Sequence, residues 1–333
     1  MKYFLSNGDL LYTRALLFTW EPISSPTVFT QTNGKFFIKQ LENVLKAFSP
    51  KHIVVNCNQL SDVDDHALKP ILEFASQHSI SFIFYSTDNE HQLYDYTQKH
   101  ILDDTSDIES RVVSDVGRFF IIKKSPDFSK LCLDSIKKEA ENLQKEKVKN
   151  VVESAYRAED NIDFKLTSTP LEASGHFNAN LINSDPFNFR WVISLIAERV
   201  QYVAMKRKLP TYTIVASSLR GAAIAASVRE ILYYRGNVKF KLFDHFGPKH
   251  DFRNTPSNHA QIEGADCFYV GDFLIGGTEV KLTQAYCKSL GGKLTDAFVI
   301  GKFTTSQELG NGIKGHCLVQ LGECVTDLWY RLK

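Results

Sequence analysis

The chain has 333 residues, 43% of them hydrophobic, and Lys+Arg 39 against Asp+Glu 38 leaves a formal net charge of +1. This length predicts about two domains, and the apolar content excludes a disordered or fibrous chain. The balanced charge excludes generic binding to nucleic acid or anionic lipid through an overall basic field, so any anion site has to be local.

The cysteines and the N-terminal stretch bear on the compartment of the protein. No CxxC pair occurs, and the cysteines lie among apolar runs, which indicates buried thiols rather than zinc ligands or disulfides. Asp9 and Arg14 interrupt the first apolar stretch, and no run approaches the roughly 18 apolar residues of a membrane span. We therefore expect a cytoplasmic protein outside the membrane. The cysteines are Cys57, Cys132, Cys267, Cys287, Cys317 and Cys324.

Short apolar runs alternate with helical patterns in the N-terminal part of the chain. A helix is predicted at 36–48, a strand at 52–57, and a second helix follows the acidic segment 61–65. Further β-branched and aromatic runs at 80–86 and 118–124 predict strands. This alternation favours a small α/β domain over residues 1–130.

The segment IVVNCNQLSDVDDHALKPIL at 53–72 is similar to STAS-type domains, the anti-sigma-factor antagonist fold. It has a hydrophobic strand, an acidic turn and a helix in that order. Asp65 and His66 stand where those domains place a serine, so no phospho-switch is implied. Asp62, Asp64 and Asp65 fit either a metal site or, more simply, the acids that stabilise a helix start. A protein partner is one expected role for residues 1–130.

The sequence between the halves is rich in helix formers with alternating charge. Residues 136–160 predict a long exposed helix, and we expect residues 131–160 to link the two domains. Residues 161–333 carry 20 basic and 15 acidic side chains, against 13 and 16 in residues 1–130. The C-terminal domain is therefore the better candidate for binding an anion.

Two strand, loop and helix units follow. Residues 212–234 have an apolar strand, a Ser-Leu-Arg-Gly turn and a helix that begins with small residues, and residues 265–303 repeat the order around the loop GDFLIGGTE. A helix start beside Arg220 favours an anion, and glycine-rich loops present backbone N–H groups at the carboxyl edge of parallel strands. Ordinary connections in α/β sheets have the same pattern, so the turns alone leave ligand binding open.

The strand, the acidic loop ending in GGT and the helix resemble the phosphoribosyl pyrophosphate (PRPP) motif of type I phosphoribosyltransferases. Residues 164–200, which include SGHFNANL, are similar to the N-terminal hood and first helix of orotate phosphoribosyltransferases. The resemblance covers residues 161–333. It implies an α/β fold in which a phosphoribosyltransferase-like parallel sheet with flanking helices follows a smaller α/β domain.

The resemblance also implies the role of individual residues. Asp272 would be the acid that binds ribose, and it would form the catalytic set with three residues of a mobile loop at 243–261. A Mg²⁺ ion would arrive with PRPP, without a direct protein-only metal site, and the protein would be a homodimer. The residues implied are Ser218, Leu219, Arg220 and Gly221 for the pyrophosphate loop, Gly276, Gly277, Thr278 and Glu279 for the 5-phosphate loop, Ser174, Gly175, His176 and Phe177 for the base side, and Lys249, His250 and Arg253 for the mobile loop.

Three positions depart from the family pattern. Gly271 replaces the first of two adjacent acids, Ile275 replaces a hydroxyl or acidic residue, and Glu279 occupies the last hydroxyl position. A carboxylate about 4 Å from a phosphate repels it by several kcal/mol at an intermediate dielectric. We therefore expect phosphate to be tolerated only where Glu279 turns outward into the first helical turn.

The mobile loop has an alternative interpretation as a metal site. His245, His250, Asp251 and His259 are potential ligands, but their spacing fits no regular metal motif, which favours a solvated loop.

Three functions are compatible with these residues. The favoured one is a divergent protein that binds PRPP or a nucleotide phosphate as a regulatory or effector module with a degenerate catalytic motif. An active Mg²⁺-dependent phosphoribosyltransferase, joining PRPP to a nitrogenous base, is the first alternative. A scaffold with a vestigial pocket, for example in a stress or anti-phage system, is the second.

Overall fold

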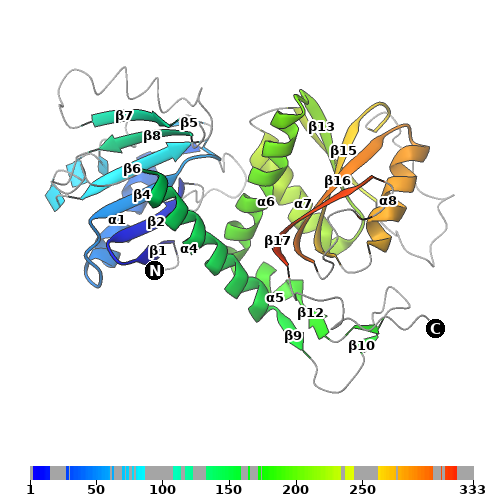
Figure 1. Cartoon of the computed structure of the whole chain (residues 1–333), viewed down its shortest axis with the longest axis horizontal. Helices are drawn as coiled ribbons and strands as arrows, with labels where there is room; N and C mark the ends of the chain where they lie inside the picture. Colours follow the sequence, from blue (N-terminus) through cyan, green and yellow to red (C-terminus); the bar gives the residue numbers. More distant parts are fainter. Residues whose placement is uncertain are drawn as a thin grey trace. The chain divides into compact units, whose positions relative to one another are not determined.

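The computed structural model describes residues 3–15, 28–29, 31–60, 62–63, 70–71, 73–74, 77–78, 80–86, 108–113, 117–122, 133–158, 164–165, 172–173, 175–233, 237–243, 262–274, 277–302, 309 and 312–320. Its contacts divide the chain into two compact units, Met1–Lys147 and Val148–Lys333. Each unit contains a sheet with parallel strands and flanking helices, which confirms the predicted α/β class (Figure 1). The boundary falls within helix α4 (Leu133–Ser154).

The first unit is built on a six-stranded sheet of order β1-β2-β4-β6-β8-β7. Strands β2, β4 and β6 are parallel to one another, and β1, β8 and β7 pair antiparallel with their neighbours. A short parallel pair, β3 with β5, stands beside this sheet and includes Asp62, which the sequence placed in a turn. The strands are β1 (Leu5–Asn7), β2 (Leu10–Arg14), β3 (Val28–Phe29), β4 (His52–Asn56), β5 (Asp62–Val63), β6 (Ser81–Ser86), β7 (Ile108–Val113) and β8 (Gly117–Ile122).

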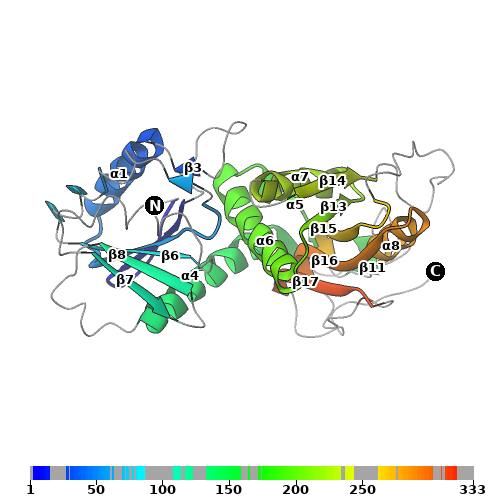
Figure 2. The same ribbon diagram turned by 90° about the horizontal axis from the view of Figure 1, so that it is seen from above.

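Helices cover both faces of this first sheet, as Figure 2 shows for α1 (Gln31–Leu45) and α4. Side chains alternate along each strand. Phe82 therefore points to one face, where its ring lies 6.3 Å from that of Phe37 on α1. Tyr12 points to the other face, where its hydroxyl donates to Gln144 Oε1 of α4 at 2.7 Å.

Helix α4 differs from the predicted linking helix in two ways. It ends at Ser154, and residues Tyr156–Ala158 form β9, which pairs antiparallel with β12 (Gly175–Phe177). Its apolar side chains, Ile136, Ala140 and Val152 among them, are buried rather than exposed. The helix therefore contributes to the packing of the chain and is more than a solvated linker.

The second unit contains a five-stranded parallel sheet of order β14-β13-β15-β16-β17. Helices α6 and α7 lie on one side of it and α8 on the other (Figure 1). A small pair, β10 (Phe164–Lys165) with β11 (Glu172–Ala173), is separate from this sheet. The other elements are β13 (Thr211–Ala216), β14 (Asn237–Leu242), β15 (Asp266–Leu274), β16 (Lys293–Lys302), β17 (Lys314–Gln320), α5 (Ala179–Asn183), α6 (Pro186–Lys206), α7 (Leu219–Tyr233) and α8 (Thr278–Ser289).

Local sequence explains where α6 begins and how it packs. Asp185 caps the helix by accepting hydrogen bonds from the backbone N–H groups of Phe187 at 2.9 Å and Asn188 at 3.2 Å, and Pro186 stands at the first helical position. Trp191 on the buried face of this helix has no exposed surface. Among the described residues, no helix is both long and apolar enough to cross a membrane.

Four of the six cysteines lie in described segments, and all four are free thiols. Cys57, Cys267 and Cys287 are buried, as the sequence predicts, whereas Cys317 is partly exposed. Cys132 and Cys324 fall outside the described residues.

Candidate functional site

Helices α7 and α8 both begin at one edge of the sheet of the second unit. Strands β13 and β15 are parallel neighbours, so the helices that follow them, α7 and α8, start at the same, carboxyl edge. A Cβ atom on Gly221 would be 3.1 Å from Ser218 Oγ and in ordinary contact, at 3.4 Å, with the Cα of Gly271. The first turn of α7 therefore packs directly against the backbone of β15 at Gly271.

On the α7 side of this edge, an arginine faces a carboxylate. Arg220 Nε lies 4.0 Å from Asp272 Oδ2, and the Arg220 side chain is 54% exposed whereas that of Asp272 is 16% exposed. Burial raises the pKa of Asp272, and the charge of Arg220 and a hydrogen bond from the backbone N–H of Phe273 partly offset this rise. Ser218 Oγ accepts the N–H of Gly221 at 3.0 Å, which fixes the turn.

On the α8 side, three polar side chains form a cluster. The Tyr269 hydroxyl donates to Glu279 Oε2 at 3.3 Å, and Ser217 Oγ lies 3.5 Å from the same oxygen and 3.3 Å from Tyr269 Oη. Burial first, and then the negative charge of Asp272, raise the pKa of Glu279. Glu279 therefore does not turn outward, which is the condition that the sequence sets for a phosphate at this position, because the Tyr269 and Ser217 hydroxyls hold its carboxylate within the site.

The Tyr269 ring fills the space beside Gly271. A Cβ atom at position 271 would lie 2.7 Å from Tyr269 Cε1 and 2.9 Å from Tyr269 Oη. Both residues point to the same face of β15, because side chains two apart on a strand share a face. The space that a side chain at position 271 would need is thus taken by an aromatic ring.

The structure places several other predicted residues near this edge. Leu219 begins α7, and Gly277 precedes α8 with a φ of 70° and no side-chain capping hydrogen bond. Thr278 is exposed at the start of α8. Phe177 of β12 is buried and stacks on Phe273, with ring centroids 4.6 Å apart. Phe273 follows Asp272 in the sequence.

Other predicted residues are not brought into the site by any described contact. Gly175 and His176 form part of β12. The positions outside the described residues are Ser174, Ile275, Gly276, Lys249, His250 and Arg253, together with Asp64, Asp65, His66, His245, Asp251 and His259 of the alternative interpretations.

Sequence reasoning missed Ser217 and Tyr269. The signal that identifies Tyr269 is the alternation of side chains along β15, which puts positions 269 and 271 on one face next to α8. Ser217 follows from the pairing of Val215 with Tyr269, since position 217 lies two residues further along that face.

A second polar cluster lies at the opposite end of the sheet, near the start of β16 and β17. Asp296 is fully buried and accepts from Arg207 Nη1 at 2.6 Å and pairs with His316 Nε2 at 2.9 Å. Burial alone would raise the pKa of Asp296, but the hydrogen bonds from His316 and Thr295 and the charge of Arg207 bring it below its ordinary value. This cluster ties the end of α6 to the sheet.

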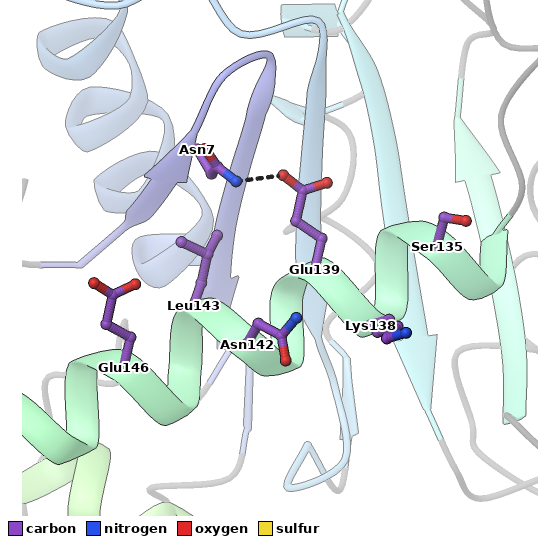
Figure 3. A pocket seen from close by; sticks show the side chains of 7 residues that line it. All are labelled: Asn7, Ser135, Lys138, Glu139, Asn142, Leu143 and Glu146. Carbon is purple, nitrogen blue, oxygen red and sulfur yellow. Dashed lines mark hydrogen bonds between the residues drawn. The ribbon is translucent and has the colours of Figure 1, made fainter.

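The first unit has a polar groove of about 260 Å³ between β1 and α4, shown in Figure 3. The Asn7 Nδ2 group donates to Glu139 Oε1 across it at 2.7 Å. Its lining mixes charges of both signs with one leucine, and it includes none of the residues that the sequence predicts for a site. The lining residues are Asn7, Ser135, Lys138, Glu139, Asn142, Leu143 and Glu146.

No protein-family model matches the chain, and no curated protein matches its sequence. Similar solved structures include orotate phosphoribosyltransferase from Aeropyrum pernix, with a TM-score of 0.36 and 14% identity over 53% of this chain and 93% of that one. Adenine phosphoribosyltransferase from Rhodothermus marinus has a TM-score of 0.39 and 14% identity over 53% of this chain and 99% of that one. Adenine phosphoribosyltransferase from Trypanosoma brucei, in complex with AMP, pyrophosphate and ribose-5-phosphate, has a TM-score of 0.39 and 13% identity over 55% and 81% of the two chains.

Proposed function

We propose that the second unit binds a sugar phosphate, such as PRPP or a nucleotide, at the carboxyl edge of β13 and β15, and that binding acts as a regulatory signal. The observation that carries this proposal is the half-exposed Arg220 beside the largely buried Asp272, 4.0 Å apart where the first turn of α7 packs against β15. A guanidinium that reaches solvent is suited to phosphate oxygens, and a fixed carboxylate accepts hydrogen bonds from sugar hydroxyls.

A regulatory rather than catalytic role is supported by position 271. Catalysis in the resembled family uses an acid there, and this chain has glycine with the Tyr269 ring in the adjoining space. The strand thus retains one acid of the pair, Asp272, which is enough to hold a ligand by hydrogen bonds.

Magnesium fits this site as a partner of the ligand. No group of three or more potential metal-binding side chains occurs among the described residues. Mg²⁺ commonly binds through one or two carboxylates together with substrate phosphates and water. The Asp272 carboxylate would hold the ion, although burial disfavours its charged form. The ion would supply positive charge next to the phosphate.

Calorimetry with PRPP and with pyrophosphate, each with and without Mg²⁺, tests this proposal on the full chain. We expect Mg²⁺-dependent binding that weakens about ten-fold or more in Asp272→Asn, because the variant loses a charged acceptor. Asp266→Asn, the same change at the other end of β15, is the matched control and should bind as the unmodified chain does. The absence of binding at millimolar ligand would overturn the proposal and leave the scaffold alternative.

One observation favours the enzyme alternative. Glu279 brings a second carboxylate into the site from α8, close enough for the charge of Asp272 to raise its pKa. If the protein is an enzyme, Glu279 would take the catalytic role of the acid that is missing at position 271. Incubation with PRPP, Mg²⁺ and orotate or other bases distinguishes the two, because release of pyrophosphate would identify an enzyme and contradict a purely regulatory role.

A further inference from the structure

The two sides of the site differ in charge balance, because Asp272 is paired with Arg220 on the α7 side whereas Glu279 on the α8 side has no ion-pair partner among the described residues. Alternation along β15 directs Asp272 toward α7, where it meets Arg220, and directs Tyr269 toward α8, where it meets Glu279. The α7 side therefore presents a guanidinium that is 54% exposed. The α8 side presents a carboxylate whose described hydrogen bonds come from two hydroxyl groups, those of Tyr269 and Ser217.

The positive charge at the start of α8 is already balanced by a carboxylate of this chain. A helix N-terminus carries a partial positive charge that favours a phosphate or a carboxylate. Here Glu279 stands in the first turn of α8, and its carboxylate is partly buried within the cluster. A phosphate brought to the same place would meet a fixed negative charge in a poorly solvated site and would be repelled.

We infer that the site distinguishes the two ends of its ligand: a phosphate faces Arg220, and an uncharged end that bears hydroxyl groups faces Glu279. Glu279 is then a specificity-determining residue. This inference rests on the proposed function and narrows its ligand class. Sugar hydroxyls donate hydrogen bonds that a carboxylate accepts, whereas a terminal phosphate offers only acceptors when fully ionised. Among the sugar phosphates of the proposed function, the site then prefers a glycosyl phosphate or diphosphate without a second phosphate at the other end of the sugar, and PRPP binds more weakly.

Ribose 1-phosphate and PRPP are suitable probes, because only PRPP has a phosphate at both ends of the sugar. In calorimetry on the full chain we expect ribose 1-phosphate to bind about ten-fold or more tightly than PRPP. Glu279→Gln keeps the size of the side chain and removes its charge. It should raise the affinity for PRPP about ten-fold and change that for ribose 1-phosphate less than about three-fold.

Two further variants separate charge from other effects. Glu263→Gln makes the same change at an exposed turn before β15 and should leave both affinities unaltered. Tyr269→Phe removes one donor to Glu279 but keeps its charge, so the preference for ribose 1-phosphate should persist. Glu279→Ser replaces Glu279→Gln if circular dichroism shows that the glutamine variant is unfolded.

The outcomes distinguish this inference from the proposed function. If the unmodified chain binds neither sugar phosphate nor pyrophosphate, both are overturned. If it binds ribose 1-phosphate and PRPP equally, or if Glu279→Gln strengthens both to the same extent, this inference is overturned and the proposed function stands. A selective gain for PRPP in Glu279→Gln is the result expected.

Discussion

Tyr269 and Gly271 share one face of β15, and the conformation of each depends on the other. The Tyr269 side chain is 2% exposed and donates to Glu279, while the absence of a side chain at position 271 leaves room for its ring. The close approach of 2.7 Å between an added Cβ and Tyr269 Cε1 is well inside van der Waals contact. The pair is therefore a single packing unit within the site.

The first prediction tests this packing by a double-mutant cycle. Gly271→Ala should lower the free energy of unfolding by roughly 1–3 kcal/mol, because the new methyl group meets a buried ring that has little room to move. In a Tyr269→Val background the same substitution should cost about 1 kcal/mol less. Urea unfolding of the four proteins measures both values, and strictly additive effects would show that the two residues are not coupled.

The sequence locates the residues of the candidate site better than it predicts the orientation of their side chains. It identifies Arg220, Gly271, Asp272 and Glu279 from their place between strand and helix. It does not predict the orientation of Glu279, because a carboxylate in a first helical turn is stable facing solvent or facing an internal donor. The choice depends on Tyr269, whose rotamer is fixed by tertiary packing.

At the scale of elements, the Asp296 cluster joins three of them. Arg207 is the C-cap residue of α6, Asp296 belongs to β16, and His316 belongs to β17. The His316 ring also stacks on Phe298, with centroids 4.6 Å apart. Because the buried Asp296 carboxylate binds Arg207 of α6 and His316 of β17, it fixes the end of α6 relative to the sheet.

The second prediction concerns the pH dependence of this cluster. Because the pKa of Asp296 is lower in the folded chain than its ordinary value, its stabilising contribution is present above the unfolded pKa of about 3.9 and is lost as pH falls through the folded pKa. Asp296→Asn should therefore cost roughly 2–4 kcal/mol at pH 7 and progressively less below about pH 4. Urea unfolding at several pH values measures this difference. A penalty that stays constant with pH would mean that the charge of Asp296 is not what stabilises the cluster.

The order of elements in the second unit is largely readable from the sequence. The predicted units at 212–234 and 265–303 appear as β13 with α7, and as β15, α8 and β16. The end of α4 is not readable in the same way. Residues 156–158 have helix-compatible composition, but pairing with β12 draws them into β9, and that partner lies beyond the reach of local pattern.

At the scale of the whole molecule, α4 supplies apolar side chains to both units. Ile136 and Ala140 are buried in the part that belongs to the first unit, and Val148 and Val152 in the part that belongs to the second. Val152 lies beside β16, since its Cγ1 atom is 3.6 Å from the position that a Cβ on Gly301 would take.

The third prediction uses this helix to separate the stabilities of the two units. Ile136→Ala should cost about 2–4 kcal/mol in the first unit, and Val152→Ala should cost a comparable or smaller amount in the second, through lost burial and a cavity. Hydrogen exchange of the full chain should show faster opening of β2 and β4 in the first variant and of β15 and β16 in the second. Equal acceleration throughout the chain in both variants would indicate one cooperative unit instead of two.

The contact between Tyr269 and Gly271 also has a consequence for how this chain can evolve. An acid that arose at position 271 by a single mutation would strike the Tyr269 ring before it could serve a ligand, so selection would act against it on stability alone. A smaller residue would first have to replace Tyr269, at the loss of the hydrogen bond to Glu279. The order of these two steps matters, because a second acid next to Asp272 becomes sterically possible only after Tyr269 has been replaced.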